Sequence, residues 1–168
     1  MKKPLIPDDS PFLTHETRKN RWAIPYHPEC LNARLDHLLT KNQKYIQGKK
    51  ILDVGSHMGT FAYAALESGA DFIEGIDTEE KMIRLGQELF QELNIAKEKY
   101  SMAVGNALEY LENIEEGSFD TVLGDALLHN RTLSTAQAHV ACGKRNGDPR
   151  HFHSGLCCYS RERGPAGL

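Results

Sequence analysis

The chain has 168 residues, which is enough for one domain with a hydrophobic core and too few for two domains of ordinary size. Hydrophobic residues make up 40% of it and charged residues 26%, as is usual for a soluble globular protein. The formal net charge of -3 does not indicate binding to nucleic acid, and no apolar run approaches the roughly 20 residues of a membrane-spanning helix. The N-terminus lacks the apolar stretch of a secretory signal, so we expect a cytoplasmic location and no membrane partner.

The first part of the chain is predicted to precede the main domain. Residues 1–20 carry three prolines and mainly polar side chains, which predicts an N-terminal arm that lies on the surface or is disordered. From Pro28 onward, leucines recur at helical spacing, and Gly48 is placed to end the helix. This amphipathic helix is expected to lead into a domain that covers residues 21–130.

Strands and helices are then predicted to alternate. The stretches "KILDVG", "DFIEGID", "YSMAVGNA" and "FDTVL" are short and apolar, as buried parallel strands are. Helical patterns separate them, and the clearest of these helices, "TEEKMIRLGQELFQELNI", is predicted to begin with Thr78 as its N-cap. This alternation predicts an α/β fold with a parallel sheet and right-handed crossovers.

The pattern stops after residue 130. The segment 131–168 contains five glycines, two prolines and a single valine, and no apolar period is recognisable in it. We therefore expect an irregular, disordered tail, with at most a short helix around "STAQAHVA".

Candidate site residues follow the predicted strands, because ligands of an open parallel sheet bind outside the carboxyl ends of its strands. Gly55 and Gly59 flank the turn after the first strand, where backbone N–H groups can approach a ligand. Asp77 ends the second strand, where a carboxylate can bind both hydroxyls of a ribose. Asn106 follows the third strand and offers a hydrogen bond to a base, and Asp125 closes the fourth.

Four motifs together resemble the class I, S-adenosylmethionine-dependent methyltransferases: "ILDVGSHMG", "IEGIDTEEKMI", "AVGNALEYL" and "GSFDTVLGDALLHN". They occur in the order and at the spacing of that family over about residues 48–130. The resemblance implies a Rossmann-like fold, with S-adenosyl-L-methionine as cofactor. In that family, residues matching Asp53, Gly55 and Gly59 line the methionine end of the cofactor, the residue matching Asp77 holds the ribose, and those matching Asn106 and Ala107 lie near the adenine. The full set of implied cofactor residues is Asp53, Gly55, Ser56, His57, Gly59, Asp77, Thr78, Asn106, Ala107 and Asp125.

Two residues depart from the family pattern. His57 stands where the family commonly has the middle glycine of Gly-x-Gly-x-Gly, so the backbone there must avoid positive φ or carry strain, which histidine tolerates better than most residues. Asn106 stands where the family more often has an aspartate, and its amide still offers an acceptor. Both positions remain compatible with binding.

The larger departure concerns the second half of the fold. The family has seven strands, whereas this chain supplies a pattern for the first four, with the expected order 3-2-1-4. The fourth strand would then be an exposed edge, and the change of composition after residue 130 resembles a truncated or frameshifted product.

The predicted function is an S-adenosylmethionine-dependent methyltransferase whose acceptor the sequence does not specify. One alternative is a catalytically incomplete cofactor-binding fragment or an interaction protein. A weaker one is a nicotinamide oxidoreductase, because residues 55–60, "GSHMGT", lack the Gly-x-Gly-x-x-Gly pattern.

Evidence for particular catalytic residues is weak. His129 and Asp125 are candidates, since family members place substrate-facing residues just after the fourth strand, and His57 is a further one. Trp22, Tyr26 and His27 either cap a ligand or pack the N-terminal segment onto the domain. The tail holds a group of thiols and imidazoles without the paired spacing of a zinc site, so no metal is predicted: Cys142, His151, His153, Cys157 and Cys158.

Overall fold

The computed structural model describes residues 4–16, 27–115, 117–124, 152–153 and 156–158. Its centre is one sheet with the order β3-β2-β1-β4-β6-β5. The first four strands, β1 (Lys50–Val54), β2 (Phe72–Asp77), β3 (Tyr100–Val104) and β4 (Thr121–Leu123), are parallel. The predicted α/β class and the order 3-2-1-4 are therefore confirmed.

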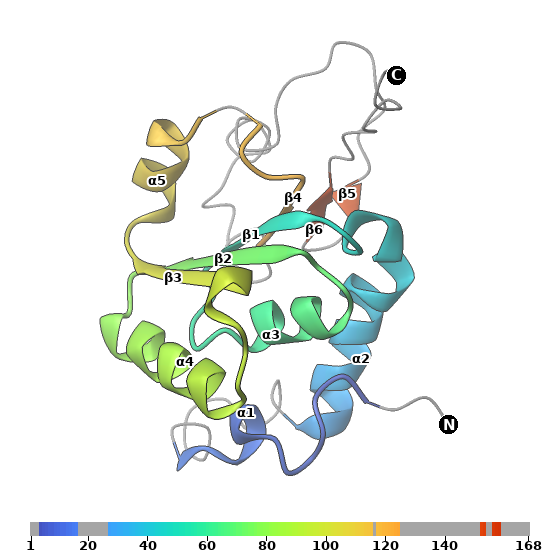
Figure 1. Cartoon of the computed structure of the whole chain (residues 1–168). Coiled ribbons are helices and arrows are strands. Elements are labelled where there is room, and N and C mark those ends of the chain that lie inside the picture. The colour runs from blue at the N-terminus through green and yellow to red at the C-terminus, as the bar shows by residue number, and fades with distance from the viewer. Residues whose placement is uncertain (1–3, 17–26, 116, 125–151, 154–155, 159–168) are drawn as a thin grey trace.

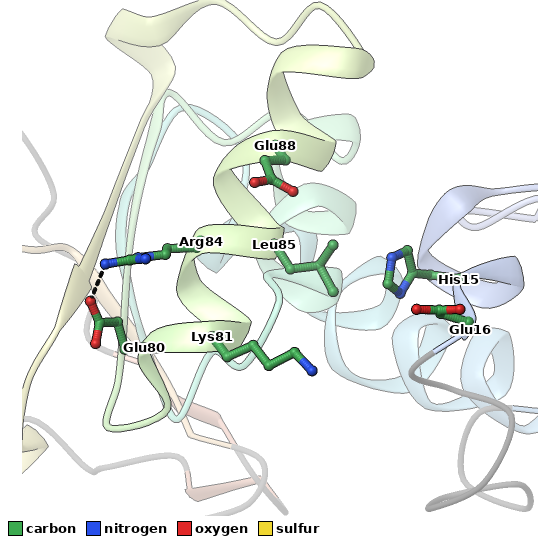
Figure 2. A pocket seen from close by; sticks show the side chains of 7 residues that line it. All are labelled: His15, Glu16, Glu80, Lys81, Arg84, Leu85 and Glu88. Atoms are coloured by element: carbon green, nitrogen blue, oxygen red, sulfur yellow. Dashed lines mark hydrogen bonds and ion pairs between the residues drawn. The ribbon is translucent and has the colours of Figure 1, made fainter.

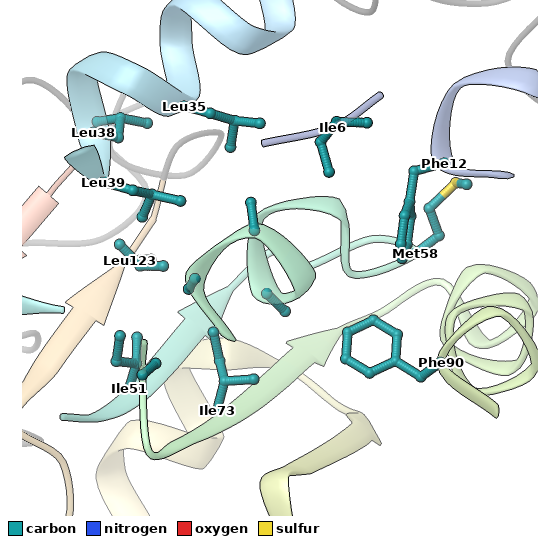
Figure 3. Packing of buried hydrophobic residues seen from close by; sticks show 14 of the residues in the cluster. Ile6, Phe12, Leu35, Leu38, Leu39, Ile51, Met58, Ile73, Phe90 and Leu123 are labelled. Atoms are coloured by element: carbon teal, nitrogen blue, oxygen red, sulfur yellow. The ribbon is translucent and has the colours of Figure 1, made fainter. Parts of the chain in front are cut away.

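Helices cover both faces of this sheet (Figure 1). α2 (Pro28–Leu38), α3 (Thr60–Glu67) and α4 (Glu80–Glu92) lie on one face, and α5 (Ala107–Asn113) lies on the other. A short 3-10 helix, η3 (Lys97–Lys99), precedes β3. Since successive residues of a strand point to opposite faces, Ile51 packs under the first set of helices and Leu52 packs under α5. The larger core lies on the side of α2, α3 and α4 (Figure 3).

The N-terminal segment is part of this core. Ile6 and Phe12 are fully buried, and Phe12 belongs to a short helix, α1 (Pro11–Thr14). The Phe12 ring lies 5.0 Å from the Tyr63 ring and 6.0 Å from the Phe90 ring. The expectation of a surface or disordered arm is therefore wrong for residues 4–16, because two apolar side chains among the polar residues are enough to anchor the segment.

Asn32 of α2 fixes the same segment by its side-chain amide. Its Oδ1 accepts the Ile6 N–H at 3.0 Å, and its Nδ2 donates to the Ile6 carbonyl at 2.8 Å. The amide thus satisfies both backbone groups of a residue that is withdrawn from water.

The helix predicted from Pro28 ends earlier than expected. α2 stops at Leu38, and a 3-10 segment, η2 (Thr40–Tyr45), follows it before the chain enters β1 at Lys50. Asn42 has non-helical φ and ψ, and its Nδ2 donates to the carbonyls of His37 and Leu38 at 3.0 and 3.1 Å. Asparagine competes with the helical hydrogen bonds in this way, which a pattern of leucines does not reveal.

The fourth strand is not an edge among the described residues. β6 (Leu156–Cys158) pairs antiparallel with β4, and β5 (Phe152–His153) pairs with β6. The expectations of an exposed fourth strand and of a tail without regular structure are wrong at these five residues. The helix expected around "STAQAHVA" lies outside the described residues. Within the described part, no helix is long and apolar enough to cross a membrane.

Candidate functional site

The turn after β1 is held against the end of β2. The backbone N–H groups of Gly55 and Ser56 both donate to the Ile76 carbonyl, at 2.9 and 3.1 Å. Gly55 has φ 76° and Gly59 has φ 78°, in the left-handed region that glycine adopts without a Cβ penalty. The two glycines therefore allow the chain to turn sharply from β1 into α3.

His57, the residue that replaces a glycine in this turn, also lies in the left-handed region, with φ 52°. The sequence left open whether this position avoids positive φ or accepts it, and the structure shows that it accepts it. A non-glycine residue in this conformation pays roughly 1 to 2 kcal/mol relative to ordinary helical backbone. The cost is offset by a hydrogen bond, because the His57 N–H donates to Asp77 Oδ2 at 2.8 Å.

Asp77 connects three parts of this edge. Its Oδ2 accepts the His57 N–H, its Oδ1 accepts the Glu79 N–H at 2.9 Å, and its carbonyl accepts the Gly105 N–H at 2.9 Å. Each carboxylate oxygen has capacity for a second hydrogen bond. Asp77 therefore joins the ends of β1, β2 and β3 and can still accept hydrogen bonds from a ligand.

The start of α4 differs from the expectation. The N-cap is Glu79, with no side-chain cap, and Thr78 is exposed at the position before it. The hydrogen bond from the Glu79 N–H to Asp77 takes the place of the predicted threonine cap. Thr78 lies between the end of β2 and the N-cap of α4, and its predicted role as N-cap is wrong.

Two polar side chains are buried beneath the turn. Asp53 is 4% exposed and Ser56 is 6% exposed, and neither Asp53 Oδ2 nor Ser56 Oγ has a hydrogen-bond partner among the described residues. Burial raises the pKa of the Asp53 carboxyl to about 7, and the negative charge of Asp77 contributes further to this rise. A buried polar atom that has no partner among the described residues requires an explanation, and a bound ligand, ion or water that supplies the partner is one.

Gly75 in β2, which the sequence analysis did not single out, creates the space for Ser56. A Cβ atom built on Gly75 would lie 2.8 Å from Ser56 Oγ. Gly75 is also the residue of β2 in register with Asp53. A glycine inside an otherwise apolar strand indicates a close approach of another group, and that signal was available in "DFIEGID".

Gly59 has a packing role in addition to its place in the turn. A Cβ atom on Gly59 would collide with the end of the Met102 side chain and lie 3.0 Å from the Phe90 ring. On α4, a Cβ atom on Gly86 would lie 2.9 Å from the Met58 carbonyl oxygen. These glycines allow the turn, α4 and β3 to approach closely, so the turn is supported from the core side.

The end of β3 supplies the remaining predicted residues. Asn106 is exposed, and its Oδ1 accepts the Leu108 N–H at 2.8 Å as the N-cap of α5. Ala107 is half-buried as the first residue of that helix. Val104, the last residue of β3, is 51% exposed. The side-chain oxygen that was predicted to contact a base is thus occupied by a helix cap, while the residue stays at the same edge.

Several predicted candidates lie outside the described residues: Asp125, His129, Trp22 and Tyr26. His27 is described as the exposed residue before α2. The side chains of the tail cysteines and histidines are likewise not described, and the described residues contain no group of three potential metal ligands.

A pocket of about 420 Å³ lies away from this edge, between the N-terminal segment and α4 (Figure 2). His15 and Glu16 line it on one side and Lys81, Leu85 and Glu88 on the other. Arg84 and Glu80 also line it and form an exposed ion pair of 2.5 Å. None of the predicted cofactor residues lines this pocket, so it is distinct from the edge formed by β1, β2 and β3.

The residues at that edge fit the cofactor that the methyltransferase resemblance implies. The unpartnered Asp53 and Ser56 oxygens, the two glycines at positive φ and the remaining acceptor capacity of Asp77 all occur at the carboxyl ends of adjacent strands. This is the place where open parallel sheets bind nucleotides.

Comparisons with known proteins identify the family to which the chain is similar. A family model of a methyltransferase domain matches residues 46–144. A protein of Methanocaldococcus jannaschii, provisionally named a ribosomal RNA large subunit methyltransferase, is 35% identical over 86 residues, which are 49% of this chain and 22% of that protein. An uncharacterized protein of Haemophilus influenzae is 33% identical over 90 residues, covering 54% of this chain and 35% of its own length. The chain thus spans between about a fifth and a third of the length of these relatives.

Solved structures show the same fold. The bifunctional kinase-methyltransferase WbdD matches 60% of this chain and 23% of its own, with a TM-score of 0.51 and 27% identity. The MccD protein matches 66% of this chain and 48% of its own, with a TM-score of 0.57 and 20% identity. With the matched residues 46–144 containing the turn, Asp77 and Asn106, the chain belongs to the methyltransferase-domain family.

Proposed function

We propose that this chain binds S-adenosyl-L-methionine at the carboxyl ends of β1, β2 and β3 and uses it for methyl transfer. The observation that carries the proposal is the position of Asp77, whose carboxylate joins the turn after β1 to the start of α4. The backbone amides hold both carboxylate oxygens in place, so the hydroxyl groups of a bound ribose could donate hydrogen bonds to them.

The cofactor supplies a methyl group that its positively charged sulfur already activates, so the protein's main task is to hold the reactants in line. In this chain, Asp77 positions the ribose, and Gly55 and Gly59 shape the turn that faces the methionine end. Asp53 and Ser56 offer the buried oxygens beneath that turn. Asn106 and Ala107 lie at the base end through their place at the start of α5.

The acceptor of the methyl group is a separate question. One relative bears a ribosomal RNA methyltransferase name, but the aligned region is only 22% of that protein. The net charge of -3 does not favour RNA as a partner. The proposal therefore specifies the cofactor and the reaction type, together with a cytoplasmic location, and names no acceptor class.

The second candidate function is a cofactor-binding fragment without activity of its own. It is favoured by β6, which pairs with β4 in antiparallel orientation, whereas the four strands β1 to β4 are parallel.

Calorimetry with S-adenosylhomocysteine tests the shared part of both candidates. We expect a dissociation constant on the order of micromolar, and loss of binding in Asp77→Ala. Asp120→Ala is the matched control, because Asp120 Oδ2 accepts the Lys50 N–H at 2.9 Å at the opposite end of β1. A folded chain that does not bind the ligand would contradict the proposal. Methyl transfer from labelled cofactor to pools of RNA, protein and small molecules then separates an active enzyme from a fragment.

A further inference from the structure

The proposed function does not explain the protonation state of the buried Asp53 carboxyl group. It lies in β1, between Gly75 of β2 and Leu123 of β4 in the register of the sheet. Neither neighbour has a polar side chain, so the sheet itself offers no partner to the carboxyl group.

The surroundings of Asp53 disfavour a negative charge. Asp53 Oδ2 and Ser56 Oγ are both buried, and neither has a hydrogen-bond partner among the described residues. Ser56 Oγ lies against Gly75 of the neighbouring strand. A buried carboxylate oxygen without a partner loses its hydration and gains no hydrogen bond in exchange. Asp77, at the end of the neighbouring strand, adds a second negative charge.

Charged and titratable groups also occur on the other elements that line this face of β1. They are His57 in the turn and Asp77 in β2, Glu29, Arg34, Asp36 and His37 on α2, Tyr63 and Glu67 on α3, and Glu80, Lys81, Arg84, Glu88 and Glu92 on α4. Of these, Asp77 is the one whose charge acts on Asp53. Arg34 lies with its guanidinium carbon 5.2 Å from the centre of the Phe61 ring. The described residues therefore provide no cation that would stabilise an ionised Asp53.

We propose that Asp53 holds a proton in the ligand-free protein at slightly acidic pH, and that this proton leaves when a ligand ammonium group is bound at the end of β1. The inference rests on the proposed function, because S-adenosylmethionine and S-adenosylhomocysteine both carry such an ammonium group. On binding, the O–H bond of Asp53 breaks and the proton passes to the solvent, while the carboxylate and the ammonium group form a buried ion pair. No electrons are transferred.

The sign of the effect follows from linkage. Binding that requires ionised Asp53 must remove the proton wherever the ligand-free group holds it, so affinity falls as the pH decreases below the pKa of ligand-free Asp53, about 7. Between pH 8 and pH 6 we expect roughly a tenfold loss of affinity for S-adenosylhomocysteine. Released protons should rise from roughly 0.1 per ligand at pH 8 to roughly 0.9 at pH 6.

Calorimetry with S-adenosylhomocysteine in two buffers of different ionisation enthalpy measures the released protons directly. Asp53→Asn should release none and should lose the pH dependence. His57→Gly is the matched control, because it removes the imidazole group of the same turn and keeps the backbone N–H that donates to Asp77. Proton release that persists in His57→Gly supports Asp53 as the source. Release that disappears there and persists in Asp53→Asn overturns the inference.

A second measurement does not need the ligand. The side-chain carboxyl carbon of Asp53, identified by its disappearance from the carbon NMR spectrum of Asp53→Asn, should titrate near neutral pH in the ligand-free chain. Titration in the ordinary aspartate range would overturn the inference even if the ligand binds. Absence of any binding would contradict the proposed function and the coupled release together, whereas binding without proton release contradicts only the inference drawn here.

Discussion

The backbone N–H of His57 donates to Asp77 Oδ2 at 2.8 Å, so a residue in an unfavourable backbone conformation is held by the carboxylate that is also expected to bind the ribose. Loss of the carboxylate should therefore affect the turn as well as the ligand. Asp77→Asn keeps one acceptor oxygen and replaces the other by an amide nitrogen, which cannot accept a backbone N–H.

For Asp77→Asn we expect the free energy of unfolding to decrease by about 1 to 2 kcal/mol, together with a large loss of S-adenosylhomocysteine binding. Asp120→Asn weakens a similar carboxylate-to-backbone bond at the other end of β1, so it should change stability by a similar amount and leave binding intact. Urea denaturation and calorimetry measure the two effects. Equal binding by both variants would contradict a ligand role for Asp77.

The packing role of Gly59 leads to a second prediction. Gly59→Ala introduces a Cβ that meets Met102 and Phe90 at a backbone φ of 78°. Gly48→Ala is the matched control, because Gly48 has φ 66° and nothing lies within 4 Å of its added Cβ. We expect Gly48→Ala to cost about 1 kcal/mol of unfolding free energy from backbone conformation alone. Gly59→Ala should cost about 1 to 3 kcal/mol more, from overpacking.

Urea denaturation of the two glycine variants decides whether close packing beneath the turn matters. If both variants lose the same stability, the contacts with Met102 and Phe90 impose no cost and the packing role of Gly59 is wrong.

The backbone of His57 can be tested by restoring the glycine that its family relatives commonly have. His57→Gly removes the cost of positive φ but gains flexibility in the unfolded chain, so we expect its unfolding free energy to stay within about 1 kcal/mol of the parent. His57→Val places a β-branched residue at φ 52° and should be destabilised by clearly more. Thermal or urea unfolding of both variants measures these changes in stability. If His57→Val is as stable as the parent, the backbone of the turn changes its conformation to accommodate valine.

The raised pKa of Asp53 predicts how stability depends on pH. The folded group has a pKa of about 7, whereas the ordinary pKa of an aspartate is 3.8, so between pH 4 and pH 7 the folded state binds more protons than the unfolded state. The contribution of Asp53 to the free energy of unfolding therefore falls as the pH rises through this window, and the penalty is complete above pH 7. From pH 5 to pH 8 the loss should be on the order of 3 kcal/mol.

Asp53→Asn cannot ionise, so it should lack this loss while sharing every other pH effect of the chain. Urea denaturation of both proteins at pH 5 and pH 8 measures the difference. If the free energy of unfolding changes equally in both proteins between pH 5 and pH 8, Asp53 is ionised throughout this range.

The sequence was a good guide to the parallel sheet, because short apolar runs alternated with amphipathic helices and the residues after each strand were polar or glycine. It also predicted the location of Asp77 and the turn at Gly55 and Gly59. It was a poor guide to the N-terminal segment, since the burial of Ile6 and Phe12 depends on a tertiary contact with α2, α3 and α4. The pairing of β6 with β4 joins residues more than thirty positions apart, and local periodicity contains no information about such a partner.

Within the site, the sequence predicted which residues lie at the edge better than what each one does. Asn106 caps α5, Thr78 does not cap α4, and Gly59 supports packing as well as the turn. These roles depend on hydrogen-bond directions and on the closeness of neighbouring side chains, which spacing along the chain does not determine.

The burial of Ile6 and Phe12 bears on how this domain should be delimited. The methyltransferase-domain match begins at residue 46, but α2 and the N-terminal segment cover the same apolar face of the sheet as α3. A shorter protein that began at the family boundary would leave that face open to water and would expose side chains such as Ile51 and Ala62. The region that homology recognises is therefore smaller than the unit that folds, and the residues before position 46 belong in any version of the chain that is to be purified.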